Sequence, residues 1–268
     1  MSKDLELFSY GSSSAGNCYW FKYGQKSFFI DLGKDPFLLE WDIQRRIDML
    51  KTNLVLISHE HTDHTKNLLK VVNKTKAKLY MHPKSFKDWS NKNKVDKLPG
   101  QFVPVIPGTT YYDEDLNITI HPILVNHNSI ANNGYFIDFK DEQKTGLFIT
   151  DCGSLDFNLL DKFLIFRLSF VMIECNHIHN DLNSKLSIKE EIQYSNVGHF
   201  SNIQVLELIE FITLWKGDSD LDFIFIHTSD GHREELLKFD DNLRKTKNLR
   251  VKRLNKQIDY FNLWQKNN

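Results

Sequence analysis

Apolar residues along this chain fall into many short runs, and the spacing inside each run predicts the local structure. Alternating or unbroken apolar runs are typical of strands, whereas apolar residues three and four positions apart indicate helices. In the first hundred residues the pattern predicts strands over 5–10, 18–23, 27–30, 54–57 and 78–81, helices over 37–50 and 66–72, and a helix or loop over 84–97. Further along it predicts strands over 116–125, 134–139, 146–150, 168–173, 221–226 and 249–253, and helices over 155–166, 202–215 and 233–242.

Strands and helices therefore recur through both halves of the chain. No repeat period is present, and no Ser/Gly-rich or Pro-rich linker divides the sequence. We predict an α/β protein with a single domain, 1–268, built of two sheet layers with helices outside them.

Composition adds limits to this picture. Hydrophobic residues make up 41% of the 268 positions and charged residues 26%, which is ordinary for a folded chain and excludes a disordered one. The 34 basic residues are balanced by 35 acidic residues, so a uniformly basic nucleic-acid coat is also excluded. The three cysteines form no Cys-x-x-Cys pair, and neither a signal peptide nor a span long enough for a bilayer is evident. We expect a cytoplasmic protein without a membrane partner.

The chemistry is concentrated where the strand over 54–57 ends. His59-Glu-His61-Thr-Asp63-His64 places four potential metal ligands within six residues. At a strand end, positions 59, 61 and 63 share one face, and a turn into the next helix returns His64 toward them. Imidazole and carboxylate together suit zinc or a related divalent metal, so we predict a metal site here.

This histidine-x-histidine-x-aspartate-histidine motif resembles the signature of the metallo-β-lactamase fold hydrolases. Later residues match other family positions in the family's order: Asp31, His127, Asp151 and His227, each at a predicted strand end. The resemblance covers nearly the whole chain and implies an αββα sandwich, in which two mixed sheets are flanked by helices.

The resemblance also implies a ligand set for two divalent metal ions, zinc first and manganese as the alternative. His59, His61 and His127 would hold one ion, and Asp63, His64 and His227 the other. Asp151 would bridge them, while Asp31 would orient a ligand from behind. A hydroxide shared by the two metals would carry out hydrolysis, so that no Ser or Cys nucleophile is needed.

Two further motifs narrow the reaction. Gly198-His199-Phe200-Ser201-Asn202 precedes a helix, and Glu174 ends a strand. In phosphodiesterase branches such as ribonuclease Z, a similar His protonates the leaving oxygen and a similar Glu orients it. We therefore assign candidate catalytic roles to Asp63, His199 and Glu174. No role is assigned to His121, His177 or His179; a loop over 177–183 is the plain interpretation of the last two.

The opening Gly11-Ser-Ser-Ser-Ala-Gly-Asn-Cys-Tyr19 resembles a subgroup of this family found in bacteria and phages. Its Gly/Ser loop could present N–H groups to a phosphate or support the metal site as a tight turn. The subgroup and its anti-Pycsar relatives imply a homodimeric phosphodiesterase that destroys cyclic nucleotide signals, in the host cytoplasm if phage-encoded. The balanced charge favours such a small substrate.

Two alternatives are kept. The first is a metal-dependent DNA or RNA nuclease, for which the segments 84–97 and 244–253 offer basic residues. The second is a non-catalytic protein that sequesters nucleotides, which the full set of ligand positions disfavours.

Overall fold

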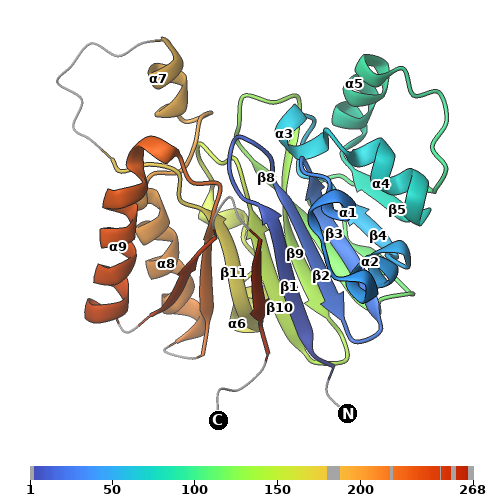
Figure 1. Ribbon diagram of the computed structural model, residues 1–268. Helices are drawn as coiled ribbons and strands as arrows, with labels where there is room; N and C mark the ends of the chain where they lie inside the picture. Colours follow the sequence, from blue (N-terminus) through green and yellow to red (C-terminus); the bar gives the residue numbers. More distant parts are fainter. Residues whose placement is uncertain (1–2, 180–187, 218–219, 248, 255–257, 265–268) are drawn as a thin grey trace.

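The computed structural model describes residues 3–179, 188–217, 220–247, 249–254 and 258–264, and places two sheets face to face (Figure 1). The first sheet has the order β14-β1-β2-β3-β4-β5-β6. Its strands are β1 Leu5–Gly11, β2 Cys18–Tyr23, β3 Lys26–Leu32, β4 Leu54–Leu56, β5 Lys78–Met81, β6 Phe102–Pro104 and β14 Asp259–Asn262. The second has the order β13-β12-β11-β10-β9-β8-β7. Its strands are β7 Tyr111–Asp113, β8 Ile118–Val125, β9 Asn132–Phe139, β10 Lys144–Ile149, β11 Leu168–Glu174, β12 Asp222–Ile226 and β13 Arg250–Arg253.

Helices lie outside both sheets (Figure 1). Those of the first half are α1 Pro36–Leu39, α2 Ile43–Leu50, α3 Thr62–Thr65, α4 Leu68–Thr75 and α5 Pro83–Asn93. Those of the second half are η1 Phe157–Leu159, α6 Lys162–Phe166, α7 Ile188–Gln193, α8 Asn202–Lys216, η2 Asp230–His232 and α9 Arg233–Thr246. Each sheet mixes antiparallel pairs with a parallel run, β3 to β6 in the first and β10 to β13 in the second. The predicted sandwich of two mixed sheets flanked by helices is confirmed.

Three buried clusters hold these layers together. The central one fills the space between the sheets with residues such as Phe21, Phe148 and Ile224. A second packs α6, α8 and α9 on the second sheet, and a third packs α2, α4 and α5 on the first. Because the sheets are covered on both faces, parallel strands such as β4, β11 and β12 are dominated by apolar runs, which is why those runs predicted strands.

The carboxyl ends of the central parallel strands meet at one edge of the sandwich, and the backbone there is strained. Asp31 lies near the end of β3, Asp151 follows β10 and His227 follows β12, with φ values of 55°, 46° and 50°. L-residues adopt this left-handed conformation at a cost, and such outliers cluster at functional sites. The strain marks the edge where the chemistry is expected.

Several predicted elements differ from the structure. The single helix predicted over 37–50 is wrong: it is two helices, because the buried Glu40 ends α1 and the Asp42 carboxylate caps α2. The helix predicted over 155–166 is likewise divided into η1 and α6, with Asp161 capping α6. The helix predicted over 66–72 is preceded by a separate turn, α3. The short elements β6, β7, α7 and β14 were not predicted.

No helix in the described parts of the chain has the length and apolar character needed to cross a bilayer.

Candidate metal centre

Three of the predicted histidines form one group. His59 and His61 follow β4, and His127 follows β8 of the opposite sheet. Their rings lie with centroids 4.6 to 5.2 Å apart, and a ligand atom of each lies within 4.8 Å of the others. Three imidazoles converging on one point form a potential nitrogen-ligand set for a divalent metal.

A second group lies beside the first. It comprises Asp63, His64, Asp151 and His227, whose ligand atoms also lie within 4.8 Å of one another. Helix α3 presents Asp63 and His64, while the strained strand ends after β10 and β12 present Asp151 and His227. The structure thus brings together all seven predicted ligands.

The Asp151 carboxylate lies between the two groups and directs one oxygen to each. Oδ1 is 3.2 Å from His64 Nε2 and 2.9 Å from His227 Nδ1. Oδ2 is 3.5 Å from His127 Nε2 and 3.9 Å from His59 Nε2. This placement fits the bridging position that the family resemblance implies for Asp151.

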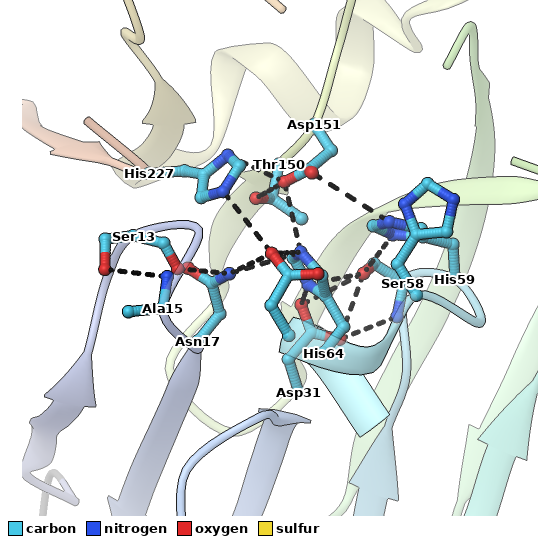
Figure 2. A network of polar contacts seen from close by, with 12 residues as sticks. Ser13, Ala15, Asn17, Asp31, Ser58, His59, His64, Thr150, Asp151 and His227 are labelled. Atoms are coloured by element: carbon cyan, nitrogen blue, oxygen red, sulfur yellow. Dashed lines mark hydrogen bonds and ion pairs between the residues drawn. The ribbon is translucent and has the colours of Figure 1, made fainter. Parts of the chain in front are cut away.

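Behind the ligand side chains, a buried network of hydrogen bonds fixes the orientation of the rings (Figure 2). Asp31 accepts hydrogen bonds from His64 Nδ1 at 2.7 Å and from Ser58 N at 2.9 Å. Ser58 Oγ donates to Asp31 and lies 3.0 Å from His59 Nδ1. His127 Nδ1 donates to the Gly198 carbonyl at 2.9 Å. Because Nδ1 of each ring is engaged in this way, Nε2 of each is left to face the centre.

The donor set fits divalent cations. His59 Nε2 and His227 Nε2 are buried and have no hydrogen-bond partner among the described residues, a state that costs free energy unless a ligand occupies it. Burial lowers the pKa of His59 well below its usual value. Burial alone would lower the pKa of His64 and His227 too, but the nearby carboxylates, Asp151 first, raise both well above the usual value. In the metal-free protein, the negative charge of the carboxylates therefore favours protonated His64 and His227.

Glu174, at the end of β11, links this centre to His199. Its Oε1 accepts hydrogen bonds from His199 Nδ1 at 2.6 Å and from His227 Nδ1 at 2.8 Å. Its Oε2 accepts the backbone N–H groups of Cys152 at 2.7 Å and Phe200 at 3.3 Å. Burial opposes ionisation, but the two histidines outweigh it and lower the pKa of Glu174 to about 2.

The imidazole of His199 stands beside the metal-ligand histidines. Its ring centroid is 5.2 Å from those of His127 and His227, and 22% of its side chain is exposed. Burial alone would lower its pKa, but Glu174 reverses the shift and raises it. The ring is therefore held through Nδ1 and can carry a proton on Nε2. The predicted pairing of His199 with Glu174 is present.

A pocket of about 260 Å³ opens next to His199 and His227. Neutral side chains predominate in its wall, among them Ser14, Asn176 and Gln193. Gln193 Nε2 donates to Asn176 Oδ1 at 3.0 Å, and Asn176 Nδ2 donates to the His227 carbonyl at 2.8 Å. The pocket wall is thereby tied to the backbone of the metal centre.

Some supporting residues were missed by sequence reasoning. Asn17, in the Gly/Ser loop, donates its backbone N–H to the Asp63 carbonyl at 2.8 Å, and its Nδ2 lies 3.2 Å from His64 Nε2. Ser12 Oγ accepts the His227 N–H at 2.9 Å, and Thr150 Oγ1 donates to Asp151 at 2.8 Å. The loop thus supports the metal site as a tight turn. Its Gly-Asn pattern was the only available signal, because the other contacts join distant parts of the chain.

The unassigned histidines lie outside both groups. His177 lies outside the helices and strands, as predicted for a loop, but it is buried against the Tyr194 ring, and burial lowers its pKa to about 4. His179 lies at the edge of the described residues; 180–183 lie outside them. His121 lies on β8, outside both ligand groups, and its Nδ1 is 3.1 Å from Thr110 Oγ1.

The segments 84–97 and 244–253, predicted as basic surfaces for nucleic acid, expose only some of their aromatic and basic side chains. Trp89 of the segment 84–97 is buried, and Phe86 stacks on Phe102. Arg253 of the segment 244–253 is buried in an ion pair with Asp240.

Comparisons with known proteins agree with this fold. Residues 30–213 match the family described as the Beta-lactamase superfamily domain. The chain is 26% identical over 200 residues to the exodeoxyribonuclease WalJ of Streptococcus pneumoniae, a match that covers 71% of this chain and 70% of that protein. Among solved structures, the metallo-beta-lactamase fold protein YhfI from Bacillus subtilis superposes with a TM-score of 0.69 at 14% identity, covering 96% of this chain and 100% of that one. The short form of human tRNase Z gives a TM-score of 0.62 at 12% identity, with 96% and 99% covered.

Proposed function

The chain belongs to the β-lactamase superfamily, with the metallo-β-lactamase fold, and from that premise we propose that it is a metal-dependent phosphodiester hydrolase. The observation that carries the proposal is the Glu174–His199 pair placed against the two ligand groups. A histidine held by a buried carboxylate is suited to protonate an alkoxide leaving group, which phosphodiester hydrolysis produces. Thioester hydrolysis has less need for such an acid, because a thiolate leaves more readily than an alkoxide.

The seven ligand residues would hold two divalent ions, and polar side chains behind them would orient the ligands. His59, His61 and His127 would hold one divalent ion, and Asp63, His64 and His227 the other, with Asp151 between them. Bound divalent ions polarise a phosphoryl oxygen and lower the pKa of water. Asp31, Ser58 and Asn17 keep the ligand side chains oriented, so the centre is preorganised before substrate arrives.

His199 supplies the proton. Its Nδ1 donates to Glu174, so the acidic proton resides on Nε2, where it can pass to the leaving oxygen. Glu174 is a positioning residue: it stabilises the imidazolium form and fixes the ring, without facing the pocket itself.

For the substrate we propose the phosphodiester bonds of DNA, because the chain is similar over 71% of its length to an exodeoxyribonuclease. Cyclic nucleotides are the second candidate, and the pocket supports them. At about 260 Å³ it is small, and Asn128, Asn176 and Gln193 offer neutral hydrogen bonds for a base or sugar. No Lys or Arg is among the described residues that line it.

A substrate panel tests the proposal. Metal-loaded protein is incubated with single- and double-stranded DNA, RNA and 3′,5′-cyclic mononucleotides, and products are separated by chromatography. We expect nucleotide release from DNA, and none from an Asp63→Ala variant that retains its melting transition. Turnover of cyclic nucleotides with intact polymers would select the second candidate. Activity of the variant equal to that of the parent, or no turnover of any phosphodiester with zinc or manganese, would overturn the assignment.

The homodimer implied by the family resemblance stays a prediction, which sedimentation of the purified protein would test.

A further inference from the structure

A second concave surface lies at the opposite end of β11 from the metal centre. Strand β11 begins at Leu168 in this groove and ends at Glu174 in the centre. Figure 1 shows α6, which forms part of the groove wall, at the lower end of the molecule, whereas α3 of the metal centre lies at the upper end. The groove has a volume of about 850 Å³. We call it the basic groove, after the four cationic side chains Lys140, Lys144, Arg167 and Lys216.

These cations are only partly neutralised. Arg167 and Lys140 share one buried carboxylate, Asp138, at 2.9 and 2.6 Å. Asp220, the acid among the described lining residues, is exposed and lies 3.5 Å from Arg250. Lys144 is left out of the charge balance, because its ammonium also contacts the Trp264 ring. Lys140, Arg167 and Lys216 face Asp138 and Asp220, so the groove keeps positive charge that an anionic ligand would neutralise.

Lys216 has no ion-pair partner among the described residues. Its ammonium lies 3.4 Å from the Phe166 carbonyl. Burial lowers its pKa, because the charged form loses water without gaining a counter-ion. A phosphate in the groove would provide that counter-ion.

Aromatic rings stand beside the cations. Helix α6 buries Leu164 and Ile165 but leaves Phe163 and Phe166 66% and 65% exposed, three positions apart on one face. The Arg167 guanidinium lies 5.6 Å from the Phe163 ring centroid. Exposed rings alternating with cations are what proteins use to bind single-stranded nucleic acid, since bases stack on the rings while phosphates meet the charges.

We propose that the basic groove binds single-stranded nucleic acid, with Phe163 and Phe166 stacking on bases and Lys216 and its neighbours contacting phosphates. The site is separate from the metal centre, and its binding does not depend on the proposed function. Its consequence for catalysis does rest on that function. The seven residues of β11 span about 20 Å, which is about six nucleotides of a stacked strand, so a 20-mer is long enough to reach both sites, whereas a 5-mer reaches both only if its bases unstack.

The test measures binding and hydrolysis separately. Anisotropy of fluorescein-labelled oligo-dT of 5 and 20 nucleotides is followed with the metal-loaded, full-length His199→Ala protein, in which cleavage is suppressed. We expect Phe163→Ala and Lys216→Gln, added to this background, each to weaken binding of the 20-mer about tenfold, with a smaller salt dependence for the lysine variant. Trp41→Ala and Lys92→Gln are matched controls, because both side chains are exposed and remote from the groove.

In the otherwise unaltered enzyme, the groove variants should raise KM for long single strands and leave kcat unchanged. Hydrolysis of bis(p-nitrophenyl) phosphate should not change. Equal affinities for groove and control variants would overturn the proposal, as would binding of poly-glutamate with the same affinity as oligo-dT, which would indicate an acidic polypeptide ligand. If the protein hydrolyses no phosphodiester, the anisotropy measurement still shows whether the basic groove binds single-stranded DNA. The binding proposal and the proposed function can therefore fail independently.

Discussion

At the scale of single residues, the chemistry depends on how one buried carboxylate is shared. Glu174 accepts hydrogen bonds from two histidines with one oxygen and from two backbone N–H groups with the other. The two backbone N–H groups stabilise the ionised carboxylate of Glu174, and they carry no titratable proton. The carboxylate can therefore support His227 in the metal centre and His199 in the pocket together.

Replacing Glu174 by Gln should slow hydrolysis of DNA by about 10- to 100-fold. His199 must be protonated to act as an acid, so activity is lost as pH rises through its pKa. Glu174 raises that pKa, and without the charge the loss of activity should move to lower pH. The kcat–pH profile, with metal content checked for each protein, measures this shift. If Glu174→Gln loses activity at the same alkaline pH as the parent, Glu174 does not set the pKa of His199.

Replacing His199 by Ala should affect substrates according to their leaving group. An alkoxide of DNA needs a proton, whereas p-nitrophenolate leaves without one. We expect a loss of about 100-fold or more in kcat on DNA and a much smaller loss on bis(p-nitrophenyl) phosphate. Equal losses on both substrates would show that His199 does not act as a general acid.

Gly33 tests how closely the backbone approaches Asp63. A Cβ at this position would lie 1.6 Å from the Asp63 carbonyl oxygen and 2.8 Å from Asn17 N. Gly33→Ala should therefore displace the loop that holds Asp63, lower stability by about 3 kcal/mol and reduce the metal content. Urea denaturation and metal analysis measure both effects. Gly231→Ala is the control, since a Cβ there meets nothing within 4 Å; similar losses in the two variants would refute the steric argument.

At the scale of elements, a buried ion pair fastens β13 to α9 and reaches the metal centre. Arg253 donates to both oxygens of Asp240 at 2.8 and 2.7 Å. Its third nitrogen donates to the carbonyl of Cys175 at 2.9 Å and to Thr228 at 2.8 Å. These two acceptors directly follow Glu174 and His227, so the pair also positions the strand ends.

Asp240→Asn should lower the free energy of unfolding by about 3–5 kcal/mol, because it leaves a buried guanidinium uncompensated. Urea denaturation gives the value. Glu210→Gln removes the exposed ion pair with Lys247 and should cost less than about 1 kcal/mol. Equal costs for the two variants would mean that the buried pair adds no more than a surface one.

The helices and strands of this fold were predictable where the apolar pattern of the segment itself determines its structure. The apolar runs of β4, β11 and β12 are buried on both faces, so composition alone identified them. Three-residue strands such as β6 and β7 are too short for a pattern, and their pairing partners lie elsewhere in the chain. The split between α1 and α2 depends on Tyr10 and Arg45 holding the buried Glu40 carboxylate, a tertiary contact that spacing cannot reveal.

The same division applies to the candidate site. Four of the seven ligand positions were predicted from a local motif, and the other three, His127, Asp151 and His227, were implied by the resemblance to the metallo-β-lactamase fold hydrolases. Ser58, Thr150 and Asn176 are ordinary polar residues in sequence, and only the packing of the two sheets brings them behind the centre. The basic groove was missed for the same reason: its cations come from separate elements.

At the scale of the whole molecule, metal should bind the folded chain and displace protons from it. In the metal-free state, carboxylates raise the pKa of His64 and His227 well above the usual value, which favours the protonated form of both rings. A ring nitrogen that binds metal cannot keep its proton, so loading should release protons and the affinity should fall as pH falls. The melting temperature should rise with metal, because the unfolded chain lacks the assembled centre.

Calorimetric titration of chelator-treated protein with zinc, in buffers of different ionisation enthalpy at pH 7, measures this release. The observed heat should vary with the buffer, corresponding to at least one proton per chain, and the variation should shrink in His64→Ala. His121→Ala is the control, because His121 lies on β8 outside both ligand groups and should behave as the parent. A heat independent of the buffer would show that the centre carries no imidazolium protons, and the balance of charge between its histidines and Asp151 would have to be assigned differently.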